Sequence, residues 1–362
     1  MAGKATVSNR ESEQQQDIVA EVERFFLRYL ALRPGLAFVM ALWSVATYFC
    51  DVFDAFGYLA ITSPTKRCGK TRACELLGFI CLQALQTVSI SPAALYRLLK
   101  AGKRTLIIDE AEHLARRRDE RSSALWEVLN SGYRKGAAVY RCTNFGKEPE
   151  AFDTYCPKVL VLIGRLLGPL ADRCIENRMD RLSNVTLERF RYERVKTEMA
   201  GLQQRVACWA KHNRRTVEEY YAGSDLPFLR DRESELWLPL FCVCAVAAHD
   251  RLAELEAIAQ DLAQVKSEHD SSDVGIRLLR DIRSAFSEMN SDALPTELLL
   301  KALNSLPHAP WGGWSNGEGL NSRALSDLLD AFAITSQNIR YEGRVLKGYK
   351  RRGFEDSWRR YL

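Results

Sequence analysis

The chain has 362 residues, of which 47% are hydrophobic and 27% charged, and this ordinary composition excludes a chain that is disordered, collagen-like or coiled-coil throughout. The length predicts about two or three domains. Lys and Arg number 51 against 46 Asp and Glu, giving a net charge of +5. Residues 340–362 hold eight basic and three acidic side chains, so this tail carries the whole excess. A surface for nucleic acid is therefore expected there first.

Cysteine usage and hydropathy predict the compartment. The ten cysteines include no CxxC pair, which favours free thiols in a reducing cytosol over a disulfide framework or a zinc site. The longest apolar run, residues 36–50, is shorter than the roughly 18–20 residues that span a bilayer. The N-terminal residues are polar and contain no hydrophobic signal core. We expect a soluble, cytoplasmic protein without a membrane segment.

Helices and strands alternate in the first half of the chain. The pattern predicts helices 17–32 and 36–53, strand 58–61, helix 71–85, strand 87–90, helix 91–102, strand 105–109, helix 119–130, and strands 137–141, 159–163 and 174–179. Such alternation predicts an α/β fold with a parallel sheet covered on both faces.

The second half of the chain is mainly helical. The pattern predicts a charged helical stretch at 186–266, a polar linker at 267–273, helices 274–289, 296–303 and 322–332, a basic hairpin and a closing helix 354–361. We expect four parts: a disordered N-terminus at 1–16, a P-loop ATPase core with two leading helices at 17–185, a helical lid at 186–272 and a winged-helix-like basic domain at 273–362.

Residues 64–71 follow an apolar strand and open a helix. They match the phosphate-binding pattern GxxxxGK[ST], except that Pro64 replaces the first glycine. In this motif backbone N–H groups and a helix N-terminus cradle phosphates, the lysine reaches the β and γ oxygens, and the hydroxyl holds Mg²⁺. The residues expected to bind nucleotide here are Pro64, Thr65, Lys66, Arg67, Cys68, Gly69, Lys70 and Thr71. The alternative is a basic strand–helix loop that binds nothing.

A second motif, Leu106–Glu110, is an apolar strand that ends in two carboxylates. The first of them, Asp109, comes 39 residues after Lys70. Asp109 is expected to hold Mg²⁺ together with Thr71, and Glu110 to orient or deprotonate the attacking water. An acidic strand end is common alone, but the two motifs in this order predict a site for ATP and Mg²⁺. Lys70 and Glu110 are its predicted catalytic residues.

The chain resembles the P-loop domains catalogued as domain of unknown function 3631, from about Trp43 to its end. The resemblance rests on residues 63–71, 88–95, 106–111, 129–134, 171–173 and 347–358. It implies a place in phages, plasmids or integrated elements, with a primase or replication protein as partner. Where this chain has Arg67 and Cys68, the family usually has small residues.

More distantly, the core is similar to superfamily-three helicases of the AAA+ class, in which a hairpin before the fourth core strand contacts DNA. This resemblance implies DNA contacts at Lys147, at the hairpin tip, and at Arg141 beside it; the alternative is a surface hairpin. Gly164-Arg165 stands where these relatives place a polar sensor. The resemblance also implies that Arg173 is an arginine finger that acts on a neighbouring subunit's γ-phosphate in a homo-oligomeric ring. The alternative for Arg173 is a salt bridge with Asp172 or Glu176.

The basic tail is expected to form the wing of the C-terminal domain. Its candidate DNA contacts are Arg340, Arg344, Lys347, Lys350, Arg351 and Arg352. Tyr341, Tyr349, Trp358 and Tyr361 lie among them and suit base stacking, unless they are core residues.

Together these features predict an ATP-dependent DNA motor, a helicase or translocase of a mobile genetic element, acting on single-stranded or forked DNA. The alternative is a nucleotide-gated loader or switch, or a defence-type ATPase, that binds nucleic acid without unwinding it. A third possibility is a degenerate ATPase, indicated by Pro64, Arg67 and Gly164-Arg165.

Overall fold

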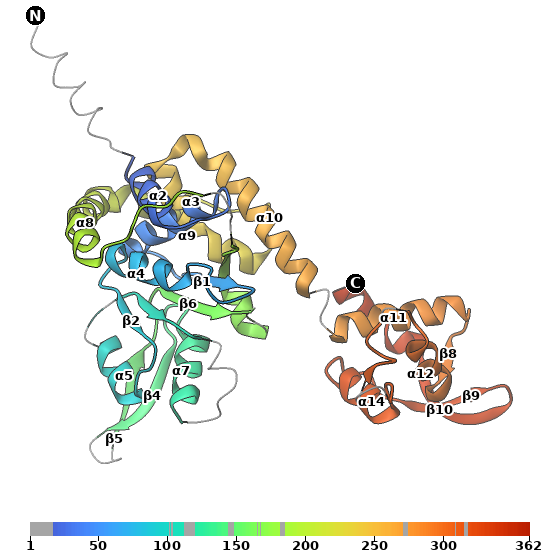
Figure 1. The fold of residues 1–362 in the computed structure, drawn as a ribbon. Coiled ribbons are helices and arrows are strands. Elements are labelled where there is room, and N and C mark those ends of the chain that lie inside the picture. The colour runs from blue at the N-terminus through green and yellow to red at the C-terminus, as the bar shows by residue number, and fades with distance from the viewer. Residues whose placement is uncertain are drawn as a thin grey trace, which may run out of the picture. The chain divides into compact units, whose positions relative to one another are not determined.

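The computed structural model describes residues 17–100, 102, 104–111, 120–143, 148–164, 166, 168–181, 185–270, 274–307, 309–314 and 318–362. The chain divides into two compact units, Met1–Ala263 and Gln264–Leu362 (Figure 1). Within the described ranges, every helix is too short or too polar to cross a membrane.

The first unit is built on a five-stranded sheet with the order β2-β3-β6-β1-β7, and every neighbouring pair is parallel. Its strands are β1 (Tyr58–Ser63), β2 (Leu85–Thr87), β3 (Leu106–Ile108), β6 (Lys158–Ile163) and β7 (Cys174–Arg178). All six residues of β1 are buried, as a central parallel strand requires. The predicted parallel sheet is thus confirmed. The strands are parallel, so the segments that follow β1 and β3 both begin at the carboxyl ends of the strands. Only β6 separates them.

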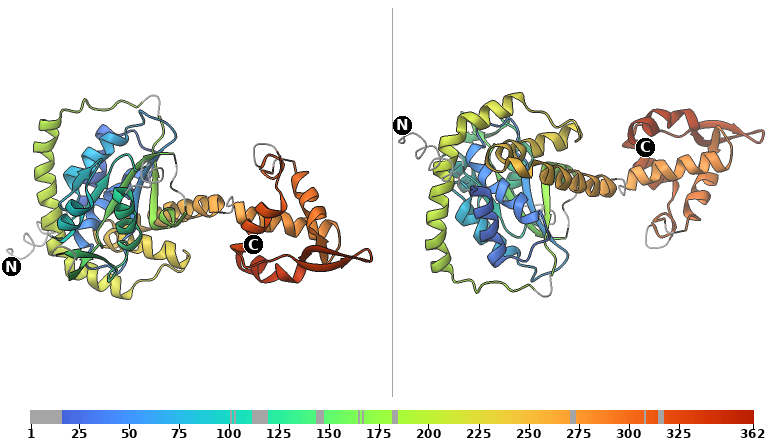
Figure 2. Two further views of the ribbon diagram at one scale, coloured as in Figure 1. Left: turned by 90° about the horizontal axis from the view of Figure 1, so that it is seen from below. Right: turned by 90° about the horizontal axis from the view of Figure 1, so that it is seen from above.

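Helices pack around this sheet. They are α2 (Ile18–Tyr29), α3 (Leu36–Ala46), α4 (Lys70–Ile80), α5 (Pro92–Lys100), α7 (Glu120–Ser131), α8 (Tyr192–Gly223), α9 (Asp231–Ala247) and α10 (Leu252–Asp270), with short 3₁₀ turns η1 (Thr47–Phe49), η3 (Gly168–Arg173) and η4 (His249–Arg251). Every residue of α3 is buried, which explains the long apolar run. Helix α3 contacts α2, α4 and α9, and α8 runs along the flank of the unit (Figure 2).

An antiparallel hairpin, β4 (Ala138–Thr143) with β5 (Glu148–Asp153), precedes β6. The sequence predicted the first strand but not β5, because Glu148-Pro149-Glu150 lacks alternating apolar residues and contains a proline. The turn at 144–147, with the predicted tip residue Lys147, lies outside the described residues, as does Arg165.

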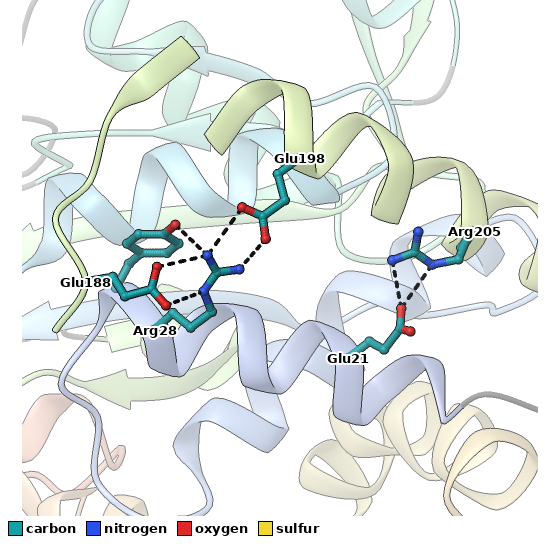
Figure 3. A network of polar contacts seen from close by, with 6 residues as sticks. Glu21, Arg28, Glu188, Glu198 and Arg205 are labelled. Atoms are coloured by element: carbon teal, nitrogen blue, oxygen red, sulfur yellow. Dashed lines mark hydrogen bonds and ion pairs between the residues drawn. The ribbon is translucent and has the colours of Figure 1, made fainter. Parts of the chain in front are cut away.

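Charged side chains fasten α2 to α8 and to the segment before it (Figure 3). The Arg28 guanidinium donates two hydrogen bonds of 2.9 Å to the Glu188 carboxylate and also pairs with Glu198. Nearer the start of α2, Glu21 accepts hydrogen bonds of 3.0 and 3.1 Å from Arg205. These contacts attach the leading helix to the helical stretch that follows the sheet.

The C-terminal unit combines short helices with a three-stranded antiparallel sheet of order β8-β10-β9. Its elements are α11 (Val274–Glu288), β8 (Ala293–Pro295), α12 (Thr296–Asn304), α14 (Ser322–Asp330), β9 (Gln337–Tyr341), β10 (Arg344–Lys350), η5 (Arg351–Gly353) and α15 (Glu355–Tyr361). Tyr349 and Trp358 are buried in its core, and the Trp358 indole donates to the Leu279 carbonyl at 3.0 Å. The prediction that these two rings stack on bases is therefore wrong, because the unit needs them to form its core.

Candidate functional site

The loop between β1 and α4 has an unusual backbone. Gly69, the N-cap of α4, has φ 88°, and Arg67 has φ 66°. Both angles lie in the left-handed region, which glycine adopts readily and arginine at a cost. The tight path directs the N-terminus of α4 into the loop, where the free N–H groups of a first helical turn bind anions.

Lys70 is the first residue of α4, and its ammonium is held at the mouth of this loop. Its Nζ donates to the Ser63 hydroxyl at 2.5 Å and to the Thr65 carbonyl at 3.4 Å. The Ser63 hydroxyl donates in turn to the same carbonyl at 2.7 Å. Ser63 was not among the predicted site residues, although its place at the end of the strand before the loop could have indicated it.

The acidic pair follows β3 in a tight turn. The Asp109 N–H donates to the Thr87 carbonyl and the Ala111 N–H to the Val161 carbonyl, which fixes the turn between two strands. The Glu110 N–H donates to the Asp109 carboxylate at 2.9 Å. Glu110 has φ 56°, a conformation that costs a residue with a side chain roughly 1–3 kcal/mol and occurs often at functional sites.

The two motifs meet in one cavity of about 450 Å³. Its lining consists of Lys66, Arg67, Cys68, Gly69, Lys70, Thr71, Asp109, Glu110, Val161, Leu162 and Ile163. All but two of the predicted nucleotide-binding residues contribute; Pro64 and Thr65 do not line it. Three cationic side chains thus share a cavity with two carboxylates and the Thr71 hydroxyl.

This donor set fits a nucleotide phosphate with Mg²⁺. Phosphate oxygens suit the cations and the helix N-terminus, while hydroxyl and carboxylate oxygens are ligands that Mg²⁺ prefers. Among the described residues, no group of three or more His, Cys, Asp and Glu side chains gathers to hold a metal. A magnesium ion here would therefore depend on phosphate and water oxygens in addition to Thr71 and Asp109.

Side-chain hydrogen bonds of Cys68, within the loop, and of Arg181, outside it, also fix the loop. Burial raises the pKa of the Cys68 thiol, but hydrogen bonds with Thr65 and Ser63 outweigh it and hold that pKa below its ordinary value. The Arg181 guanidinium donates to the Lys66 carbonyl at 2.8 Å. Arg181 comes from beyond β7, so no local pattern identified it.

Arg173 directly precedes β7 and so lies at the amino ends of the strands, opposite the carboxyl ends that carry the cavity. It donates to the Asn130 side-chain oxygen at 2.7 Å and to the Pro169 carbonyl at 3.1 Å. Among the described residues it forms no salt bridge with Asp172 or Glu176, and Glu176 instead accepts a 2.5 Å hydrogen bond from Thr62. The alternative prediction, a salt bridge between Arg173 and Asp172 or Glu176, is therefore wrong.

The predicted DNA contacts differ in their surroundings. Arg141 donates to the Tyr96 hydroxyl at 2.8 Å and pairs with Glu127, so it is tied to α5 and α7. The six candidates of the tail lie on β9, β10 and η5, and none of them forms an ion pair with a described residue; they are Arg340, Arg344, Lys347, Lys350, Arg351 and Arg352.

The fold and the cavity define a Rossmann-like α/β protein with a phosphate-loop type of strand–loop–helix. A family model described as Protein of unknown function (DUF3631) matches residues 178–361, just over half of the chain, and the chain belongs to this family. The expected resemblance from Trp43 onward is matched only in this later part. The loop after β1 and the acidic pair lie before the matched segment.

Known proteins with similar sequence or structure add context. A Saccharopolyspora erythraea protein, described as an uncharacterized 28.9 kDa protein in the xis 5′ region, is 36% identical over 177 residues; the match covers 49% of this chain and 65% of that protein. The NrS-1 C-terminal region in an apo form has a TM-score of 0.43 at 11% identity, covering 92% of this chain and 75% of that one. A structure described as a candidate ATPase from Cytophaga hutchinsonii has a TM-score of 0.27 at 11% identity, covering 99% and 98%. Neither score establishes a shared fold.

Proposed function

We propose that this chain is a Mg²⁺-dependent ATPase of a mobile genetic element and that hydrolysis in the cavity after β1 and β3 drives a DNA motor, a helicase or translocase. One observation carries the proposal: the Gly69-Lys70-Thr71 triplet and the Asp109-Glu110 pair, which come from separate strands, line the same cavity. If the loop bound nothing, there would be no reason for the acidic pair to line the same cavity.

The residues have separable roles in this proposal. Lys70 keeps its bond to Ser63 and donates to the β and γ phosphate oxygens through its remaining N–H groups, and Thr71 and Asp109 hold the metal. Mg²⁺, when bound, neutralises charge on the phosphates. Glu110 is exposed at the cavity and orients and deprotonates the attacking water.

The wider architecture supports a RecA/AAA+-type core that works as a ring. The order β2-β3-β6-β1-β7 separates the loop strand from the acidic strand by β6, and Arg173 lies at the edge away from its own cavity. In a ring, Arg173 would act on the nucleotide of a neighbour. The helices of residues 186–272 are then the lid, and the helix–strand–helix–helix–hairpin order of the C-terminal unit fits a winged-helix-like module.

DNA is the proposed partner because the six candidate cations on β9, β10 and η5 form no ion pair with a described residue. Four of them, Arg340, Arg344, Lys347 and Arg352, are exposed. The family resemblance and the xis 5′ region of the Saccharopolyspora relative favour an element that replicates or moves, with a primase or replication protein as a second partner.

A nucleotide-gated loader or switch is the second candidate. Arg141, expected at the DNA hairpin, is bound to Glu127 and Tyr96 instead, which favours a hairpin that does not grip DNA. Strand displacement on a forked duplex separates the two functions. A motor displaces the strand with ATP but not with a non-hydrolysable analogue, and Lys70→Ala displaces none. A loader binds the fork in an ATP-dependent way and displaces nothing.

A further inference from the structure

We infer that Arg232 joins Arg173 in a phosphate-binding surface supported by Tyr133, and that this surface receives the triphosphate bound by a second copy of this chain. The inference rests on the proposed ATPase function and adds a second arginine to the contact with the neighbouring copy. It starts from three guanidinium carbons that surround the Tyr133 ring: those of Arg134, Arg173 and Arg232 lie 5.5, 5.3 and 5.6 Å from its centroid. They come from the loop after α7, the end of η3 and the first turn of α9.

Two of these three cations have no carboxylate partner among the described residues. Arg134 pairs with Glu235. Arg173 bonds only to neutral oxygens, and its Nε is buried without a hydrogen-bond partner. Arg232 is exposed and forms no ion pair or hydrogen bond with a described residue. Like charges gathered at one ring repel each other, and an anion between them would turn that repulsion into binding.

The backbone that carries this ring is held in place by a buried lysine and a backbone hydrogen bond. Lys158 is fully buried, and its ammonium donates to the carbonyls of Gly132, Thr154 and Cys156 at 2.9–3.1 Å. Residue 132 must be glycine, because a Cβ there would lie 2.4 Å from the Lys158 Nζ and 2.2 Å from the Thr154 carbonyl oxygen. The next residue, Tyr133, accepts a 2.8 Å bond from the Phe56 N–H through its carbonyl. A binding surface gains from such preorganisation because little ordering remains to be done.

The phosphate must come from another molecule. Arg173 directly precedes Cys174, which pairs with Tyr58, the first residue of β1, whereas the phosphate loop follows Ser63, the last. At about 3.3 Å per residue the strand separates them by roughly 16 Å or more, which is beyond the reach of an arginine side chain. A second copy of this chain supplies a triphosphate at its own loop, so a head-to-tail contact between copies completes the site.

Arg232→Ala tests the new residue. We expect ATP turnover to fall at least tenfold while the Kd for ATP stays within twofold, because the chain's own loop is intact. Arg232→Lys should recover only part of the turnover, since a lysine lacks the planar fork. Arg215→Ala is the matched control, because Arg215 is exposed on α8 and pairs only with Glu219 among the described residues. Unchanged turnover in Arg232→Ala would overturn the inference for this residue.

Mixing two inactive variants tests the partner. Lys70→Ala lacks a working loop but keeps its arginines, whereas Arg173→Ala/Arg232→Ala keeps its loop. If the arginines act across copies, an equimolar mixture should regain about a quarter of wild-type turnover, the share of head-to-tail contacts that pair a good loop with good arginines. No recovery from a mixture of folded variants, with ATP binding by Arg173→Ala/Arg232→Ala intact, would overturn the second copy as partner.

Assembly gives a readout that does not require turnover. With a non-hydrolysable ATP analogue and Mg²⁺, wild type should sediment as a larger species, and Arg232→Ala should require more protein to do so. Equal assembly of the two proteins contradicts the inference. Wild type that neither binds nor hydrolyses ATP would instead contradict the proposed function, so the two failures are distinct.

Discussion

The ammonium of Lys70 lies 2.5 Å from the hydroxyl oxygen of Ser63, so the first residue of α4 is bonded to the last residue of β1. The bond spans the loop and holds the cation beside the cavity that also receives Asp109 and Glu110. A lysine positioned in this way loses little side-chain freedom when it meets a phosphate.

Ser63→Ala removes that positioning without removing the cation. We expect ATP affinity to fall about two- to tenfold, the equivalent of one ordinary hydrogen bond, while Lys70→Ala should abolish turnover. Isothermal titration with ATP and Mg²⁺ measures the effect. Ser63→Thr keeps the hydroxyl and serves as the control; a loss of affinity as large in Ser63→Thr as in Ser63→Ala would rule out the hydroxyl as the cause.

Glu110→Gln keeps the shape of the side chain but removes the base. Turnover should fall by about 10²- to 10⁴-fold with little change in ATP affinity, because Glu110 acts on water and not on the nucleotide. Single-turnover hydrolysis beside a binding titration separates the two effects. Turnover above a tenth of wild type would show that another group activates the water.

Cys68 should report nucleotide binding. Because its pKa is held below the ordinary value, more of it is thiolate near pH 7.5 than of Cys81, whose pKa burial raises to about 12. Iodoacetamide should therefore modify Cys68 before Cys81, and ATP with Mg²⁺ should slow only Cys68. Cys208, exposed on α8, is the control by mass spectrometry. Equal labelling of Cys68 with and without nucleotide would contradict nucleotide binding in this loop.

The contact between α2 and the segment before α8 should make the stability of the fold sensitive to acid. The hydrogen bond from Arg28 lowers the pKa of Glu188 below its ordinary 4.5, so folding favours the charged carboxylate. The stability that follows is complete above pH 4.5 and is lost as the pH falls through the folded-state value. Arg28→Met should thus lose less stability than wild type between pH 7 and pH 3.5 in denaturant titrations. Arg215→Met should behave like wild type; an Arg28→Met profile parallel to wild type would contradict the assignment.

The tail cations should set the salt dependence of DNA binding. Deleting residues 340–362 is not a clean test, because Tyr349 and Trp358 belong to the core of the C-terminal unit. Arg340→Ala, Arg344→Ala and Lys347→Ala combined should flatten the slope of log affinity against log salt by about 0.7 for each phosphate of single-stranded DNA that these side chains neutralise. Arg359→Ala with Arg360→Ala is the control, since both pair with Asp356. An unchanged slope in the triple variant would remove these residues as the DNA site.

Local patterns predicted the parallel sheet and the two motifs of the cavity. Gly69-Lys70-Thr71 and Asp109-Glu110 stand at strand ends, and parallel strands bring their ends to one edge of a sheet. The alternation of helices and strands indicates parallel strands, whereas the order β2-β3-β6-β1-β7 is known only from the structure. The sequence therefore predicted that both motifs lie at the same end of the sheet, and the structure adds that they line one cavity.

The contributions that were missed depend on contacts between distant segments. Arg181 reaches the Lys66 carbonyl from beyond β7, and Arg232 meets Tyr133 only after α9 has packed. The aromatic residues of the tail were identified, but their spacing fits both base stacking and burial in a core. In the structure Tyr349 and Trp358 are buried. Sequence patterns do not distinguish a buried ring from an exposed one when a charged residue stands beside it, as Lys350 does beside Tyr349 and Arg359 beside Trp358.

The most direct test is ATP hydrolysis by the full chain with Mg²⁺, with and without single-stranded DNA, beside Lys70→Ala. Wild type should hydrolyse ATP, DNA should accelerate it, and Lys70→Ala should be inactive in both conditions. Wild type that binds no ATP, or turnover that survives in Lys70→Ala, would contradict an ATPase site in the cavity formed by the loop after β1 and the acidic pair after β3.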